Sequence, residues 1–206
     1  MATTQQTPDA KESSLSHLVT AVLYTIVSVV AFGVIYPLLI WGLGTVLFHH
    51  QAEGSLIVDK SGKLIGSELV GQSFSKPQYF QGRPSAAGKG YDPTQTGGTN
   101  LGPTSKKLIE STKSTIAALK KANPDANGPI PMDLVTSSAS GIDPDISPEG
   151  AYYQAPRVAK ARGLALDEVR ALIAAHITPR QLGLLGEPRV NVLELNRALD
   201  AQSSPT

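Results

Sequence analysis

The sequence contains no cysteine among its 206 residues. This absence excludes disulfide bonds, thiolate zinc sites and cysteine nucleophiles, and it is compatible with either side of a membrane. Aromatic residues are also scarce, at 5%, whereas glycine and proline are plentiful, with 19 and 15 residues. We therefore expect a domain that is rich in turns and has a modest hydrophobic core.

The chain has almost no excess of charge of either sign. Its 18 basic and 17 acidic residues leave a net charge of +1, so no nucleic-acid or other polyanionic partner is predicted. A chain of this length with one membrane span has room for a single extramembrane domain.

Charged residues are absent from residues 18–48. A helix needs about 20 apolar residues to cross a bilayer, so we predict a transmembrane helix at 18–48, a polar N-terminal tail at 1–17 and a domain at 49–206. A cleaved signal peptide is the first alternative, but its apolar core is about 7–15 residues long and follows a basic start. The only Lys or Arg before this stretch is Lys11, which has acidic residues on both sides. A buried core helix of this length would normally show a polar face.

One face of the predicted span gathers small and hydroxyl residues. At 100° per residue, six side chains fall on one side of the helix, and they are Thr20, Ala21, Tyr24, Thr25, Ser28 and Ala31. Such faces are typical of contacts between membrane helices, so we predict a partner helix in the lipid bilayer. A solitary anchor with incidental Ser and Thr is the alternative. Pro37 is predicted to kink or end the regular helix.

Charge counting gives a weak prediction of orientation. The tail carries Lys11, and the first residues beyond the span carry Lys60 and Lys63. The positive-inside rule then favours a cytoplasmic domain by a single charge. Long domains cross the membrane largely regardless of charge, so this indication has little weight.

The remaining sequence predicts a mixture of short strands and helices. Residues 55–58 and 63–66 predict a β-hairpin whose turn places Gly62 at positive φ. Cap and breaker residues predict further elements, and these are a helix from Thr104 or Ser105 to Ala122, a short strand within 129–135, a helix from Ser147-Pro148-Glu149 that kinks or restarts at Pro156 and ends near Gly163, a helix capped by Asp167, a strand at 189–192 and a last helix capped by Asn191. We therefore predict an α+β fold, with one N-terminal transmembrane helix followed by a single small turn-rich domain.

The segment 74–102 has neither helical nor strand periodicity. A stretch of this length is either a linker or an ordered functional loop. Its aromatic residues Phe74, Tyr79, Phe80 and Tyr91 would pin it to the domain, so we predict an ordered loop.

A glycine-rich string closes this segment just before a predicted helix. It consists of Gly97, Gly98, Thr99, Asn100, Leu101 and Gly102. Backbone N–H groups at a helix N-terminus bind phosphates or carboxylates, so this string is the candidate nucleotide or partner loop. An ordinary tight turn with a helix cap is the alternative, and on the residues alone it is favoured.

Two patterns typical of enzymes are incomplete. Gly82 and Gly88 are separated by five residues, and Lys89 is followed by glycine, so the P-loop pattern fails. Ser73 and Lys76 match the Ser-x-x-Lys of penicillin-binding enzymes, but the Ser-x-Asn and Lys-Thr-Gly partners are missing. A membrane-anchored serine acylase therefore stays only as the alternative function.

The acidic residues of the domain give no complete site either. Ser137, Asp143 and His176 invite a catalytic-triad interpretation, yet the Gly-x-Ser-x-Gly elbow is absent. Asp143, Asp145 and Glu149 lack the spacing of a calcium loop. We expect capping and turn roles for these residues and predict no catalytic residue and no metal site.

Several strings together resemble one family. In chain order they are 69–74 (LVGQSF), 79–86 (YFQGRPSA), 91–93 (YDP), 97–104 (GGTNLGPT), 133–143 (DLVTSSASGID), 157–164 (RVAKARGL) and 185–200 (LGEPRVNVLELNRALD). The ordered set resembles the KdpC family, the C subunits of bacterial Kdp potassium-transporting P-type ATPases, and it covers Leu18 to Asp200. Thr99 stands where many relatives have serine, a change that keeps the hydroxyl.

This resemblance implies a non-catalytic accessory subunit of an ATP-driven, high-affinity potassium uptake complex. The implied partners are a potassium-channel-like subunit, a P-type ATPase subunit that hydrolyses ATP, and a small one-helix subunit. The implied location is the bacterial inner membrane, as a single-pass protein with a cytoplasmic N-terminus and an extracytoplasmic domain. The resemblance also implies a catalytic chaperone that raises the affinity of the ATPase subunit for ATP, with the string at 97–102 compared to a nucleotide-binding signature. ATP is thus the implied cofactor, bound directly or through the ATPase subunit.

Overall fold

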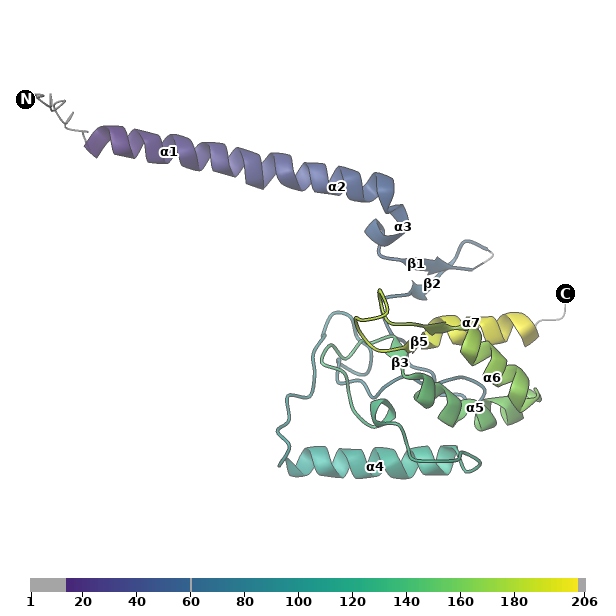
Figure 1. The fold of residues 1–206 in the computed structure, drawn as a ribbon. Helices are drawn as coiled ribbons and strands as arrows, with labels where there is room; N and C mark the ends of the chain where they lie inside the picture. Colours follow the sequence, from purple (N-terminus) through teal and green to yellow (C-terminus); the bar gives the residue numbers. More distant parts are fainter. Residues whose placement is uncertain (1–13, 60, 204–206) are drawn as a thin grey trace, which may run out of the picture. The chain divides into compact units, whose positions relative to one another are not determined.

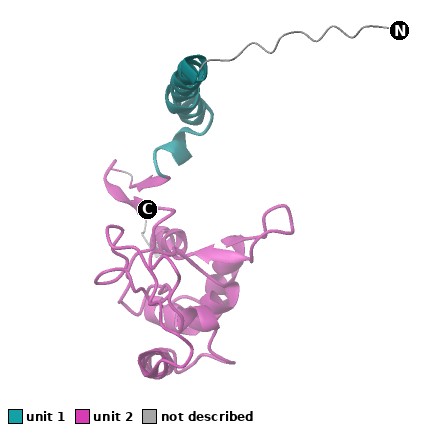
Figure 2. Ribbon diagram, turned by 90° about the vertical axis from the view of Figure 1, so that its left-hand side faces the viewer, with its two compact units in different colours: residues 1–54 teal, residues 55–206 magenta. Residues whose placement is uncertain are grey.

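The computed structural model describes residues 14–59 and 61–203 (Figure 1). The chain separates into two compact units, residues 1–54 and residues 55–206 (Figure 2). The tail predicted at 1–17 lies outside the described residues as far as residue 13.

The first unit is dominated by one long apolar helix. It consists of α1 (Ser14–Val30), a π-helical turn η1 (Ala31–Ile35) and α2 (Tyr36–Leu47), and a short helix α3 (His49–Ala52) follows. The continuous helix has 34 residues, none of them buried in this chain. At a rise of about 1.5 Å per residue it is about 50 Å long, more than the hydrocarbon core of about 30 Å requires. Among the described residues it is the one helix long and apolar enough to cross a membrane, and it begins at Ser14, earlier than the predicted Leu18.

Pro37 interrupts the regular α-helix without ending it. Pro37 has no N–H to donate, and its ring would crowd the carbonyl four residues earlier, which belongs to Gly33. The π turn immediately before it widens the helix, and the N–H of Tyr36 donates to the carbonyl of Ala31, five residues back. The helix then continues to Leu47.

The second unit is a small α+β domain. Strands β1 (Leu56–Val58) and β2 (Leu64–Ser67) form the predicted hairpin, with Gly62 at φ 81°. A second antiparallel sheet has the order β3-β5-β4, from Asp145–Ile146, Arg189–Asn191 and Ile177–Thr178. Helices α5 (Pro148–Arg162) and α7 (Val192–Ser203) contact its central strand β5, and α6 (Leu166–Ala175) packs against both helices. Their core is formed by Ile146, Val158, Val169, Ile173, Val190, Leu195 and Leu199.

The predicted helix caps at three positions are confirmed. Ser105 precedes α4 (Lys106–Ala122), and its Oγ accepts from the N–H of Leu108 at 3.5 Å. Ser147 Oγ accepts from the N–H of Gly150 at 2.9 Å at the start of α5. Asn191 Oδ1 accepts from the N–H of Glu194 at 3.1 Å in α7.

Three local predictions are corrected. Residues 129–135 form no strand; they contain a 3₁₀ turn, η2 (Met132–Leu134). Helix α5 runs through Pro156 to Arg162 as one helix, so no second helix begins at Pro156, and it ends at Gly163, with φ 67°, where its end was predicted. Helix α6 begins before Asp167, because the carboxylate of Glu168 accepts from the N–H of Ala165 at 3.3 Å and fixes the cap there.

Candidate functional site

The membrane helix presents the predicted small and hydroxyl face on a regular α-helix. All but the last of its six residues belong to α1, and Ala31 follows it directly. Thr20 Oγ1 donates to the carbonyl of Ser16 at 2.9 Å, and Thr25 Oγ1 donates to that of Ala21 at 2.8 Å. These two hydroxyl protons are therefore used within the helix, so a partner helix would meet small side chains and hydroxyl oxygens that accept. Contact with a partner helix remains a prediction.

In the second unit, segment 74–102 is ordered, as predicted, because buried amides hold its backbone. Asn196 of α7 accepts from the N–H of Phe80 at 2.8 Å and donates to its carbonyl at 2.9 Å. Gln154 of α5 makes the same two-way contact with Gln81, at 2.9 and 3.0 Å. Each amide thus makes the two backbone hydrogen bonds that a neighbouring strand would otherwise make with one residue of the segment. The side chain of Phe80 is fully buried.

Arg157 is the buried cation that ties the start of this segment to α5. Its guanidinium donates to the carbonyls of Pro77 and Tyr79, and also to Asn123 Oδ1 at 2.9 Å and Gln154 Oε1 at 2.8 Å. Every one of these acceptors is neutral, and burial lowers the pKa of Arg157 to about 10. Sequence reasoning missed this role, although an arginine with buried Ala155, Val158 and Ala159 close by on a helix is a signal that could have found it.

Tyr91 and Ser85 close the middle of the segment. The Tyr91 hydroxyl donates to the carbonyl of Arg83 at 2.6 Å, and the Tyr91 N–H donates to Ser85 Oγ at 2.7 Å. A side chain at Gly71 or Gly82 would collide with the Tyr91 ring or hydroxyl, so both positions require glycine. Burial, with help from the charge of Asp143, raises the pKa of Tyr91 to about 12.

The six predicted residues 97–102 form one loop, and it packs against the loop at 138–141. The N–H of Gly97 donates to the carbonyl of Ser140 at 2.8 Å. A Cβ at Gly98 would lie 3.2 Å from the carbonyl oxygen of Ala139. Asn100 adopts a positive φ of 50°. Gly98 therefore serves a close approach between two backbones, whereas a Cβ at Gly97 would meet no atom within 4 Å. A nucleotide or partner role for this loop stays a prediction.

Asp133, Asp143 and Asp145 each bond to other residues of the domain. Asp143 pairs with Arg83 at 2.8 Å, and Asp145 pairs with Arg189 at 3.0 Å. Asp133 accepts from the N–H and the hydroxyl of Ser147 at 2.7 and 3.0 Å. Burial raises the pKa of Asp145, and the charges of Asp143 and Glu194 add to this while Arg189 opposes it. Within the described residues, no group of three or more His, Asp or Glu side chains could hold a metal ion.

Ser73 and His176, which belong to the incomplete enzyme patterns, each have neighbours within the domain. Ser73 lines a groove of about 560 Å³ between segment 74–102 and α4. Lys76 is not among the described residues that line this groove. The ring of His176 bonds the carbonyl of Leu172 at 2.8 Å, on its own helix.

Comparisons with known proteins point to one family. A family model for KdpC, described as the c chain of the K⁺-transporting ATPase, matches residues 18–201. The chain is 52% identical over 192 residues to the potassium-transporting ATPase KdpC subunit of Koribacter versatilis, covering 92% of this chain and 97% of the relative. It is 56% identical over 186 residues to the KdpC subunit of Acidobacterium capsulatum, covering 90% and 98%. It is 50% identical over 190 residues to that of Myxococcus xanthus, covering 92% and 90%.

Proposed function

Because the chain belongs to the KdpC family, the c chains of K⁺-transporting ATPases, we propose that it is a non-catalytic accessory subunit that holds a potassium uptake complex together. The observation that carries this proposal is the helix Ser14–Leu47, which buries none of its residues in its own chain. An apolar helix with one small, hydroxylated face gains by packing against other helices in a bilayer.

The partners are the chains that the family resemblance implies. They are a potassium-channel-like subunit, a P-type ATPase subunit and a small one-helix subunit, all in the bacterial inner membrane. The face that begins at Thr20 packs against one of them. The N-terminus is cytoplasmic and the second unit extracytoplasmic, as the resemblance implies.

The influence on ATP use, the catalytic-chaperone role, is indirect and passes through the ATPase subunit. Two observations support this. The N–H of Gly97 is already bonded to Ser140, and Gly98 lies close against the backbone of Ala139, so these glycines are occupied by packing within the domain. ATP is also cytoplasmic, on the other side of the membrane from the proposed place of the domain.

Removal of the chain tests the proposal as a whole. Cells that lack it should lose high-affinity potassium uptake, and the remaining subunits should no longer purify as one stable complex. Unchanged uptake and an intact complex without this chain would sink the proposal.

Two sets of helix variants locate the contact. The first set places leucine on the small face, with Thr20→Leu, Ala21→Leu and Ser28→Leu together. The matched control places leucine on the opposite face, with Val22→Leu, Ile26→Leu and Val29→Leu. We expect the first set to lose co-purification with the other subunits and the control set to keep it, because bulk on the small face keeps backbones apart. Equal behaviour of the two sets would remove the small face from the proposal.

The serine acylase alternative is tested separately. A penicillin probe should leave the wild-type chain unlabelled if the chain is non-catalytic. Labelling that disappears in Ser73→Ala would replace the accessory role by an enzymatic one.

A further inference from the structure

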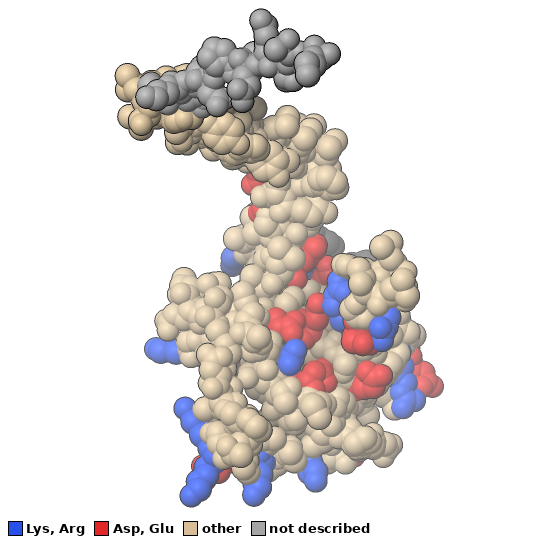
Figure 3. Space-filling view, turned by 60° about the vertical axis from the view of Figure 1, so that its left-hand side comes forward, with Lys and Arg blue, Asp and Glu red and all other residues tan. Residues whose placement is uncertain are grey.

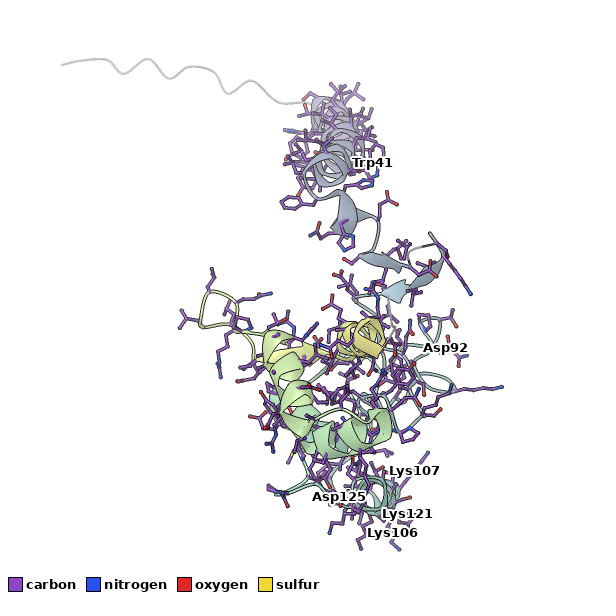
Figure 4. The ribbon with its side chains drawn as sticks, turned by 90° about the vertical axis from the view of Figure 1, so that its right-hand side faces the viewer. Trp41, Asp92, Lys106, Lys107, Lys121 and Asp125 are labelled. Carbon is purple, nitrogen blue, oxygen red and sulfur yellow. The ribbon has the colours of Figure 1, made fainter. Side chains whose placement is uncertain are left out.

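The connection between β4 and β5 exposes three leucines at one tip. We call residues 179–188 the leucine loop. Leu182, Leu184 and Leu185 are 90%, 80% and 60% exposed, and the loop stands clear of the body of the domain, as the pale loop at the left of Figure 4 shows. Isolated exposed apolar residues are ordinary, but a cluster on a projecting loop marks an interaction site.

The loop is braced so that the leucines are held outward. Gln181 and Leu185 exchange backbone hydrogen bonds, both at 2.9 Å. Arg180 and Glu187 form an ion pair at 2.5 Å across the base. Leu182 has a φ of 53°, a left-handed conformation that is costly for a leucine. A loop that served only to connect two strands would need neither the leucines nor this backbone strain.

The leucine loop lies at the end of the domain that carries β1 and β2. The views in Figures 1, 2 and 4 agree that α4 lies at the opposite end. The chain enters the domain from the membrane helix through Ser55, at the start of β1. The hairpin and the turn after it add more exposed apolar side chains to this end, and they are Leu56, Val58, Leu64, Ile65 and Leu69.

The two ends of the domain also differ in their charged residues. Helix α4 carries five exposed lysines, and they are Lys106, Lys107, Lys113, Lys120 and Lys121. Figure 3 shows basic side chains gathered at that end of the domain. The apolar end is thus the end at which the chain enters the domain, and the basic side chains gather at the opposite end of the domain.

We propose that the leucine loop docks into an apolar pocket on another protein chain of the transport complex. This rests on the proposed function, because it assumes that the chain works inside such a complex. The charges of the loop favour a protein over lipid: its only charged residues, Arg180 and Glu187, neutralise each other, and it contains no aromatic residue. Segments that bind bilayer surfaces instead combine basic residues with Trp or Phe. A braced apolar tip fits the pattern of an interface anchor that fills a pocket on its partner.

Photo-crosslinking in the intact complex identifies the occupant. A photo-crosslinking residue replaces Leu184 in the full chain, and the same residue replaces Met132 as the control, because Met132 is also exposed, at 75%. We expect the label at 184 to form a covalent adduct with a different protein chain of the complex, and the label at 132 to form none. Adducts only with lipid, only with a second copy of this chain, or with nothing would each overturn the proposal.

Variants measure the contribution of the contact. The double variant Leu182→Ser, Leu184→Ser removes only exposed side chains, so thermal unfolding should match the wild type. The fraction of the chain retained on the washed complex should fall roughly tenfold, as the loss of interface anchors produces, while Met132→Ser keeps wild-type retention. Full retention of the double variant would reject the docking loop. If the small-face leucine variants still lose retention, the accessory function stands; if wild-type chain is itself not retained, the accessory function fails.

Discussion

Arg157 is the residue on which the order of segment 74–102 depends most. Arg157→Met keeps the length of the side chain but removes the donor to two buried side-chain oxygens, those of Asn123 and Gln154. It also removes the donor to the part-buried carbonyls of Pro77 and Tyr79. Since each unsatisfied buried acceptor costs about 1–3 kcal/mol, we expect the free energy of unfolding to fall by about 3–5 kcal/mol, measured by urea unfolding of the full chain in detergent. The control is Arg170→Met, because Arg170 is exposed and pairs with the exposed Asp167 at 3.5 Å; it should change stability by less than about 0.5 kcal/mol. Equal effects of the two substitutions would contradict the proposed role of Arg157.

The raised pKa of Tyr91 predicts that the free energy of unfolding falls at alkaline pH. The pKa of its phenol is raised from 10.0 to about 12 in the folded chain, so the unfolded chain loses this proton first as the pH rises. The stabilising contribution is therefore complete below pH 10 and is lost as the pH rises through about 12. Unfolding curves of wild type and Tyr91→Phe should show a steeper alkaline decline for the wild type. Parallel declines would show that Tyr91 does not titrate in this way.

At the scale of elements, a substitution at Gly98 tests whether the loop 97–102 packs within the domain or binds a nucleotide. A valine at Gly98 must push against the Ala139 backbone, because even its Cβ would lie 3.2 Å from the Ala139 carbonyl oxygen. Overpacking of this kind costs about 1–3 kcal/mol, so Gly98→Val should lower the melting temperature of the chain and loosen the complex. The exposed neighbour supplies the control, Thr99→Val, which should change neither. A Gly98→Val chain of normal stability in an intact complex with weakened ATP affinity would instead favour direct nucleotide contact.

Elements with a strong local signal were predictable, and those that depend on distant contacts were not. The uncharged stretch 18–48, the hairpin turn at Gly62 and the caps at Ser105, Ser147 and Asn191 follow from local chemistry. Strands β3 and β4 have two residues each, too few for any periodicity. The order of segment 74–102 was expected from its aromatic residues, yet the amides and the guanidinium that hold it come from α5 and α7. Their hydrogen bonds join residues that are 73 to 116 positions apart in the chain, and no local sequence pattern predicts such contacts.

At the scale of the whole molecule, placing the domain outside the cytoplasm decides how this chain influences ATP use. Lys11 before the span and the lysines after it favour a cytoplasmic domain by one charge, whereas the family resemblance implies the opposite side. An extracytoplasmic domain reaches the ATPase machinery only through partner chains. A cytoplasmic domain would put the loop 97–102 in the same compartment as ATP.

Cysteine labelling resolves the orientation cleanly, because the chain has no native cysteine. Single substitutions Ser61→Cys and Thr3→Cys place one thiol on each side of the membrane helix, and Ser61 is exposed in the β1–β2 turn. In intact cells, a membrane-impermeant thiol reagent should label Ser61→Cys and leave Thr3→Cys unlabelled until the cells are lysed. Labelling of both variants after lysis is the control that each thiol is reactive. If intact cells instead label only Thr3→Cys, the domain faces the cytoplasm, the count of lysines gave the correct orientation, and direct contact with ATP replaces the indirect route.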